Sequence, residues 1–156
     1  MSDDDIKRAV EQALRENQAI DPTDIIVSVK DGVVTLDGFV RGYNQKWEAE
    51  DVVKKLPDVV SVANDIEVRL PLIHQRPDPD IARDCLEWIR YRVPAAADRI
   101  KVIVSGGEVT LEGEVDSDYQ RSEAEAAVRK VRGVKAIYNM IKVRQPAPAE
   151  TASHER

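Results

Sequence analysis

Apolar residues recur along the chain with two spacings, and these alternate in a fixed order. Ile6, Val10 and Leu14 lie four positions apart, as on one face of a helix. From Ile25 the apolar positions alternate with other residues, which predicts a strand, and the same alternation resumes at Val34. A second helical stripe (Ala49, Val52, Val53 and Leu56) and a last alternating stretch (Val62, Ile66 and Val68) follow. The predicted order is helix, strand, strand, helix, strand.

The whole pattern occurs twice. Adding 75 to a residue number in the first half gives its counterpart in the second, without a gap from Asp5/Asp80 to Pro71/Pro146. Of the 67 pairs in this register, 25 are identical, far more than chance allows for an ungapped self-match. The chain is therefore a tandem duplication.

Turn residues fall at matching places in the two copies. Asp31-Gly32 and Gly106-Gly107 separate the first two predicted strands, and both dipeptides suit two-residue hairpin turns. The second helix has Asn44 as its candidate N-cap in the first copy, and Asp116, Ser117 or Asp118 in the second. The predicted fold class is α+β, with two tandem αββαβ modules. Each is a three-stranded mixed sheet with two helices on one face.

A glycine stands at the end of the second predicted strand in each copy. We interpret Gly38 and Gly113 as structural residues that permit a bend or a close approach of the second helix.

The predicted organisation has four parts. The first copy covers residues 3–71 and the second covers residues 80–146. Between them, residues 72–79 form a Pro-rich linker, because prolines interrupt both strands and helix interiors. Residues 147–156 are small, polar and aperiodic, which predicts a disordered tail.

The residues that usually carry chemistry are scarce. Cys85 is the one cysteine, and the two histidines, His74 and His154, lie in Pro-rich or terminal contexts. No metal-spaced pair, phosphate loop or nucleophile motif occurs. We therefore expect no enzymatic activity, no cofactor and no metal. A pI near 5.0 also disfavours nucleic acid as a partner.

The composition predicts a folded chain with a charged surface, since 42% of its residues are hydrophobic and 33% are charged. No apolar run approaches the roughly 18 residues of a membrane span, so we expect no transmembrane segment. The acidic start, Met1-Ser2-Asp3-Asp4-Asp5, does not suit a signal peptide. The expected location is the cytoplasm.

A repeated motif gives a family resemblance. The pattern Val-x-Val-x-x-Gly-x-Val-x-Leu-x-Gly-x-Val stands at 27–40 and again at 102–115, and each copy later carries an Asn-x-Ile-x-Val run at 64–68 and 139–143. The chain resembles the BON domain family, named for bacterial osmotically inducible and nodulation proteins. The resemblance implies a non-enzymatic module linked to osmotic stress, envelope maintenance or phospholipid attachment. Many relatives are periplasmic or lipid-anchored, and this chain departs from them because it lacks a lipobox cysteine near its start.

The two copies differ most in their first helix. Glu11, Ala13, Glu16 and Gln18 become Leu86, Trp88, Tyr91 and Val93, with Arg90 and Arg92 interspersed. Trp and Tyr beside Arg suit a membrane–water boundary or a protein partner. The candidate binding residues are thus Leu86, Trp88, Arg90, Tyr91, Arg92 and Val93. This edge could equally pack on the first copy or on the linker, or mediate self-association, and the oligomeric state stays open.

Charge is also unevenly divided. The chain's net charge is −6, and the first copy through Pro71 holds 9 basic and 15 acidic residues, which accounts for all of it. The second copy carries a candidate basic patch of Arg129, Lys130, Arg132, Lys135, Lys142 and Arg144. Such a patch favours anionic lipid or an acidic protein surface. A contact with the acidic first copy, or an ordinary solvated face, explains it as well.

Asn64 and Asn139 stand at a core-facing position of the last strand. Our first interpretation is a structural amide that satisfies backbone groups, and a polar ligand contact is the second. Two functional hypotheses follow. In the first, the chain is a stress-linked adaptor that binds an anionic membrane or a protein partner through its second copy. In the second, it is a soluble sensor for a small ligand or ion bound between the copies.

Overall fold

The computed structural model describes residues 2–144, so the predicted tail at 147–156 lies outside the described residues. The chain divides into two compact units between Gln75 and Arg76, inside the predicted linker.

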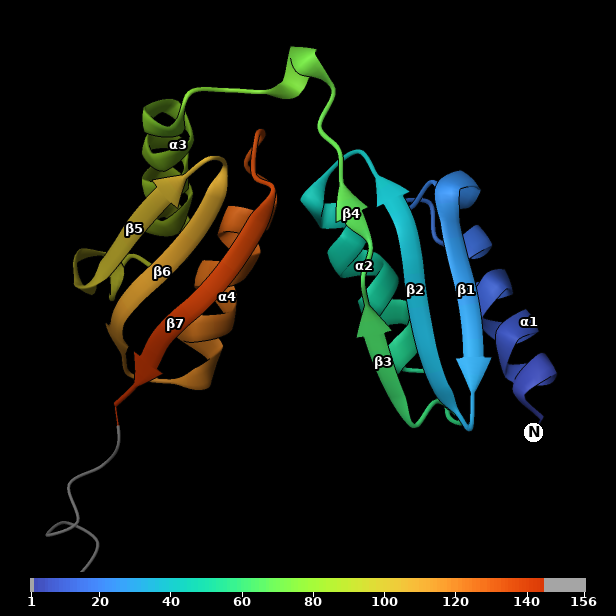
Figure 1. The fold of residues 1–156 in the computed structure, drawn as a ribbon. Coiled ribbons are helices and arrows are strands. Elements are labelled where there is room, and N and C mark those ends of the chain that lie inside the picture. The colour runs from blue at the N-terminus through green and yellow to red at the C-terminus, as the bar shows by residue number, and fades with distance from the viewer. Residues whose placement is uncertain (1, 145–156) are drawn as a thin grey trace, which may run out of the picture. The chain divides into compact units, whose positions relative to one another are not determined.

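The first copy folds as helix, strand, strand, helix, strand (Figure 1). Its elements are α1 (Asp3–Glu16), β1 (Ile25–Lys30), β2 (Val33–Val40), α2 (Tyr43–Lys54), β3 (Ser61–Asn64) and β4 (Glu67–Val68). A short 3₁₀ turn, Pro22–Asp24, leads into β1. Strand β2 is central: it pairs antiparallel with β1 and parallel with β3 and β4. The predicted last strand is thus interrupted at Asp65 and Ile66.

The second copy repeats this order. Its elements are α3 (Asp78–Arg92), β5 (Ile100–Ser105), β6 (Glu108–Val115), α4 (Asp118–Arg129) and β7 (Ala136–Val143). Strand β6 is central, antiparallel to β5 and parallel to β7, which runs without interruption. The α+β class and the two αββαβ modules with mixed sheets are confirmed.

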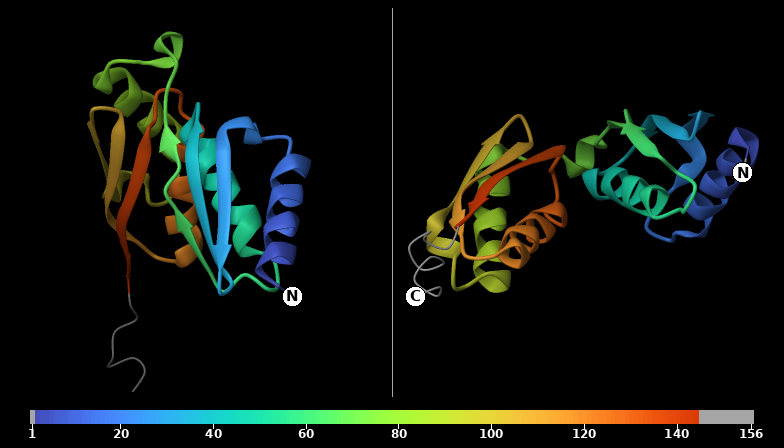
Figure 2. Two further views of the ribbon diagram at one scale, coloured as in Figure 1. Left: turned by 45° about the vertical axis from the view of Figure 1, so that its right-hand side comes forward. Right: turned by 90° about the horizontal axis from the view of Figure 1, so that it is seen from below.

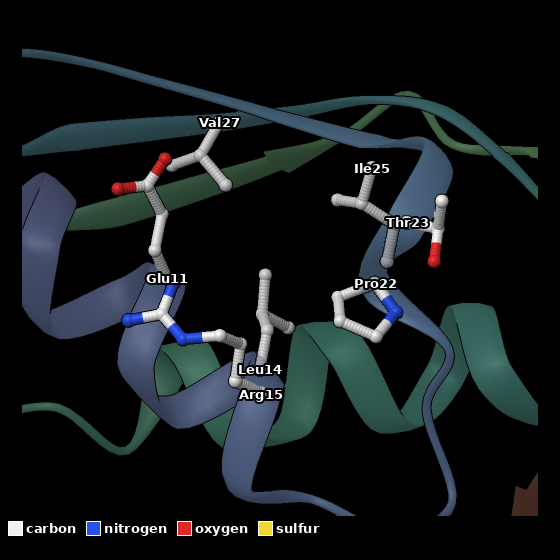
Figure 3. A pocket seen from close by; sticks show the side chains of 7 residues that line it. All are labelled: Glu11, Leu14, Arg15, Pro22, Thr23, Ile25 and Val27. Carbon is white, nitrogen blue, oxygen red and sulfur yellow. The ribbon is translucent and has the colours of Figure 1, made fainter.

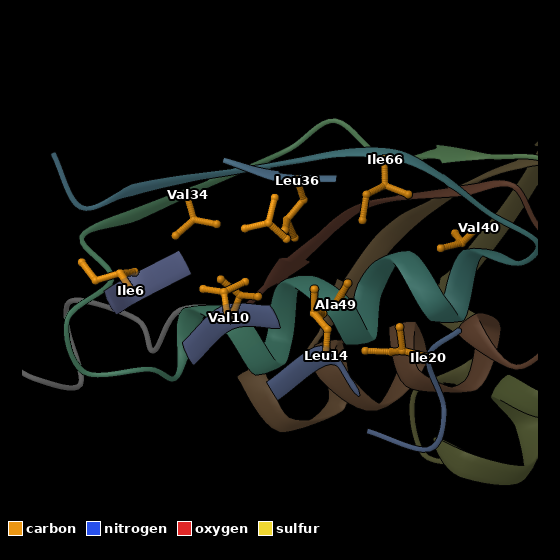
Figure 4. Packing of buried hydrophobic residues seen from close by; sticks show 11 residues of the cluster. Ile6, Val10, Leu14, Ile20, Val34, Leu36, Val40, Ala49 and Ile66 are labelled. Atoms are coloured by element: carbon orange, nitrogen blue, oxygen red, sulfur yellow. The ribbon is translucent and has the colours of Figure 1, made fainter. Parts of the chain in front are cut away.

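Two helices cover one face of each sheet, and the core lies between them (Figure 2). In the first copy, side chains from α1 and α2 meet those of the strands (Figure 4). Its fully buried members, each no more than 2% exposed, are Val10, Leu14, Val34, Leu36, Ala49, Val53 and Ile66. Residues on the opposite face of the sheet, such as Ile26, are exposed. One-sided burial explains why the strands alternate in sequence.

Both predicted two-residue hairpins are confirmed. The turn residues Asp31, Gly32, Gly106 and Gly107 all have positive φ. Each turn is held by an aspartate from the first helix of its copy. Asp3 accepts hydrogen bonds from the backbone amides of Asp31 and Gly32, at 2.9 and 3.1 Å. Asp78 does the same for Gly106 and Gly107, at 2.9 and 3.0 Å.

The glycines of the second strand have a different neighbour from the one we expected. Gly38 and Gly113 have φ of 92° and 130°. A Cβ at either position would collide with a backbone carbonyl oxygen, that of Asp24 or Arg99, in the turn before the first strand. The close approach is therefore to this turn and not to the second helix.

The predicted helix caps are half right. Ser117 is the N-cap of α4, where its hydroxyl accepts a hydrogen bond from the Gln120 amide at 3.2 Å. Asn44 is not the N-cap of α2, because that helix begins at Tyr43 and Gly42 takes the cap position without a side-chain bond. Glycine is a common alternative at this position, since its backbone adopts the cap geometry freely.

The segment that enters the second copy is fixed by Arg76. Its guanidinium forms an ion pair with Asp84 at 2.8 Å and donates a hydrogen bond to the Arg132 carbonyl at 3.1 Å. Helix α3 then starts at Asp78, two residues inside the predicted linker. Pro79 does not prevent this start, because the first helical residues need no intrahelical partner for their amides.

Candidate functional site

The outer face of α3 carries two exposed aromatic side chains. Tyr91 is 79% exposed and Trp88 is 40% exposed. Their rings form an edge-to-face pair, with centroids 6.0 Å apart and planes at 89°. Together with Glu87 they line an open hollow on the surface. Exposed aromatic pairs of this kind are unusual on a face that only meets water, and they favour a binding surface.

The other two apolar candidates lie elsewhere. Val93 is only 4% exposed and caps the end of α3, so it belongs to the core of the second copy. Leu86 is partly buried. At about 100° per residue, it projects roughly 160° around the helix from Trp88, on the opposite flank. The continuous apolar edge that we expected from Leu86 to Val93 is therefore reduced to the aromatic pair.

The arginines of α3 have separate roles. Arg92 is partly buried and forms an ion pair with Glu123 of α4 at 3.5 Å, which joins the two helices. Arg83 is paired with Asp80 at 3.0 Å. Arg90 is exposed and forms no ion pair within residues 2–144. Of the two arginine candidates, Arg90 is the one without an ion pair there, but it projects roughly 160° around the helix from Trp88, on the same flank as Leu86.

The candidate basic patch is divided between the two ends of β7. Lys135 immediately precedes this strand and Lys142 lies near its far end. Seven residues of extended chain separate them by about 23 Å. Lys130 and Arg132 lie with Lys135 in the connection between α4 and β7. Lys135 and Lys142 therefore do not belong to one patch, because the extended strand between them places them far apart.

Ion pairs further reduce this patch. Arg129 is largely buried and lies 3.8 Å from Glu125. Arg144 lies 3.4 Å from Glu114 and 3.7 Å from Asp116. The remaining members, Lys130, Arg132, Lys135 and Lys142, form no ion pair in the part of the chain that the structure describes. Three of these four lie in the short connection before β7.

The two asparagines make the same bonds in both copies. The Asn64 side-chain nitrogen donates to the Lys46 carbonyl at 3.0 Å and to Glu50 at 3.3 Å, and its oxygen accepts from the Ile66 amide. Asn139 repeats this with the Arg121 carbonyl, Glu125 and the Ile141 amide. These contacts support the structural interpretation, since both amide groups are already engaged within their own copy.

The thiol of Cys85 is buried in the core of the second copy, and burial raises its pKa to about 12. A thiol is a nucleophile only as the thiolate, so this one is chemically inert near neutral pH. Among residues 2–144 no group of three or more His, Cys, Asp or Glu side chains is placed to hold a metal ion. The same residues include no helix long and apolar enough to cross a membrane.

Sequence reasoning missed the hollows of the first copy, of which the one beside α1 is lined by charged side chains of opposite sign. This hollow lies between α1 and β1, has a volume of about 270 Å³ and is lined in part by Glu11 and Arg15. The sequence does show that Glu11 in the first copy is replaced by Leu86 in the second. We interpreted this difference only as an added apolar residue in the second copy and not as a charged residue specific to the first.

Comparisons with known proteins agree with the duplicated fold. The family model described as the BON domain matches residues 2–69 and again residues 77–145. The chain is similar to "Osmotically-inducible protein Y" of Escherichia coli strain K12. The two are 33% identical over 150 residues, which cover 92% of this chain and 74% of that protein.

Two solved structures are also similar. One is CdsD, described as a structural protein of the type III secretion system of Chlamydia trachomatis. It has 14% identity and a TM-score of 0.40 over 97% of each chain. The other is the C-terminal domain of CdsD, with 14% identity and a TM-score of 0.36 over 93% of this chain and 68% of that one.

Proposed function

The chain belongs to the BON domain family, and from that premise we propose that it is a non-enzymatic, stress-related protein that attaches to an anionic membrane surface through its second copy. The stress-related role is supported by family membership and by the likeness to an osmotically inducible protein. The observation that carries the membrane attachment is the exposed Trp88–Tyr91 pair on α3.

The chemistry of this pair suits the boundary between lipid and water. Trp and Tyr concentrate at membrane interfaces, where an apolar ring and a polar tip are both accommodated. Arg90 leaves α3 about 100° from Tyr91 and about 160° from Trp88, so it adds positive charge to the same helix but not to the face of the two rings. Lys130, Arg132 and Lys135, in the connection before β7, add positive charge in the same copy, and a basic residue near an anionic surface contributes about 1 kcal/mol.

Co-sedimentation with vesicles tests the proposal. The full chain is mixed with vesicles of phosphatidylglycerol and phosphatidylcholine, or of phosphatidylcholine alone, at low and at physiological salt. We expect binding to the anionic vesicles, weaker at higher salt because charges on the surface are screened. Failure to bind anionic vesicles at both salt concentrations contradicts membrane attachment and leaves a protein partner as the occupant of this face.

Two tyrosines provide a matched pair of variants. Tyr91→Ala removes an aromatic ring from α3, and Tyr119→Ala removes one of similar exposure, 74%, from α4 of the same copy. We expect Tyr91→Ala to weaken vesicle binding at least about threefold and Tyr119→Ala to leave it unchanged. Equal effects of the two substitutions would mean that α3 is not the attachment surface.

The alternative, a ligand held by Asn64 and Asn139, gains no support from geometry. Each amide bonds to its own helix and strand, at distances of 3.0 to 3.3 Å. A ligand at either asparagine would have to displace these bonds.

A further inference from the structure

The hollow in the first copy has the features of a small-molecule site. It opens between the last turns of α1 and the segment that enters β1 (Figure 3). At about 270 Å³ it lies just below the usual pocket range for drug-sized ligands, roughly 300–1,000 Å³, so only a small molecule fits. The residues that line it are Glu11, Leu14, Arg15, Pro22, Thr23, Ile25 and Val27.

Opposite charges stand side by side on one wall. Glu11 and Arg15 are four residues apart on α1, so their side chains leave the same helix face. They form no ion pair with each other among the described residues. Arg15 instead donates a hydrogen bond to Gln12 at 2.9 Å, and the Glu11 carboxylate has no hydrogen-bond partner within residues 2–144.

The floor of the hollow is apolar. Leu14 and Val27 are buried core residues, 2% and 7% exposed, and Ile25 and Pro22 close the far side (Figure 3). The hollow therefore presents a carboxylate, a guanidinium and a short hydrocarbon surface within one small volume.

We propose that this hollow binds a small α-amino acid in its zwitterionic form. The ligand's ammonium group donates hydrogen bonds to Glu11, and its carboxylate accepts them from the Arg15 guanidinium, whose planar donors match a carboxylate. A short aliphatic side chain then lies on Leu14 and Ile25. A quaternary ammonium is a poorer fit, because it has no N–H to donate and the hollow offers no aromatic ring to hold it.

The second copy lacks this arrangement. Leu86 stands at the position of Glu11, while Arg90 retains the position of Arg15. The carboxylate on the helix is thus lost, and the second copy serves as an internal reference. The proposal concerns the first copy alone and is independent of membrane attachment by α3.

Amide NMR spectra of the full chain test the site. Titration with L-alanine or L-proline is expected to shift the amide signals of residues 11–27 and to saturate at millimolar ligand. Glycine betaine, which keeps both charges but has no N–H, and acetate, which has no ammonium group, should each bind at least about tenfold more weakly. The absence of saturating shifts with either amino acid overturns the proposal, as does equal binding of alanine and acetate.

Substitutions then locate the carboxylate. Glu11→Leu installs the residue that the same fold carries in the second copy, and Glu11→Gln removes the charge with little change of shape. Both should weaken alanine binding at least about tenfold. Asp37→Asn, at an exposed position of β2, is the control and should have no effect. If folded Glu11→Gln protein binds alanine as tightly as the parent chain, the proposal is wrong.

Discussion

Asp78 accepts a hydrogen bond from the backbone amide of Gly107, 3.0 Å away, and so ties the first turn of α3 to the β5–β6 hairpin. Asp3 makes the equivalent bond to Gly32 at 3.1 Å in the first copy. Both carboxylates lie at a helix N-terminus, where the helix dipole also favours negative charge. Asp3 and Asp78 therefore each join the first turn of a helix to a hairpin turn that lies 28 or 29 residues later in the chain.

Replacement of Asp78 by alanine should destabilise the second copy by about 1.5–3 kcal/mol, because two backbone amides lose a charged acceptor. Urea unfolding followed by fluorescence measures this. Each copy holds one tryptophan, so in a Trp47→Phe background Trp88 reports on the second copy alone. Asp80→Ala also removes a first-turn carboxylate, together with its exposed ion pair with Arg83, but no bond to the hairpin, and should cost no more than about 1 kcal/mol. Similar losses for the two variants would contradict the role of the hairpin bond.

Gly113→Ala should destabilise the second copy by about 3 kcal/mol or more, because the new Cβ adds a collision with the Arg99 carbonyl to an unfavourable φ. Gly106→Asn separates these two causes. Position 106 also has positive φ but no atom within 4 Å of an added Cβ, and the first copy carries Asp31 there. Gly106→Asn should therefore lower the free energy of unfolding by less than about 1 kcal/mol. Both are measured by the same urea unfolding, and a mild effect of Gly113→Ala would mean that the turn can move away.

Asp116 should titrate below the usual aspartate pKa. Hydrogen bonds from the Arg99 guanidinium, at 3.2 and 3.4 Å, favour its charged form and lower its pKa. Since the folded pKa is depressed, this contribution to stability is present at neutral pH and is lost as the pH falls through the folded value. Carboxyl NMR titration should show the midpoint rising in Arg99→Ala and unchanged in Arg83→Ala. An unchanged midpoint in Arg99→Ala would remove Arg99 as the cause.

Cys85 should resist alkylation in the folded chain. At about pH 8, a pKa of about 12 instead of an ordinary 8.5 lowers the thiolate fraction by roughly three orders of magnitude. Reaction with iodoacetamide, followed by mass spectrometry, should be correspondingly slow in buffer and fast in concentrated urea. A fast reaction in buffer would indicate frequent local opening of α3.

The fold could be predicted because the duplication checks every local pattern twice. A period-two stretch or a glycine turn is ambiguous alone, but its recurrence 75 residues later makes chance improbable. The role of Asp78 could not be predicted, since an acidic residue at a helix start already has an ordinary explanation in the helix dipole. Its bond to Gly107 depends on how α3 packs beside the hairpin.

The candidate site was predicted less well, for geometric reasons. Val93 follows the last residue of α3, so helical spacing no longer describes where its side chain points. Lys135 and Lys142 lie close in sequence but at opposite ends of an extended strand. Membrane attachment and the cytoplasmic location stay predictions.

The contacts of Arg76 with Asp84 and with the Arg132 carbonyl affect how the second copy responds to tension on the linker. Force applied through the linker acts on Arg76 before it acts on α3. The Arg76 side chain forms an ion pair with Asp84 in α3 and a hydrogen bond with the Arg132 carbonyl in the connection between α4 and β7. Two residues later Asp78 fastens the chain again, to the hairpin. Tension is thus shared between three elements instead of unwinding the first turn of the helix. The second copy should bear load at its N-terminal end without losing the surface that α3 presents.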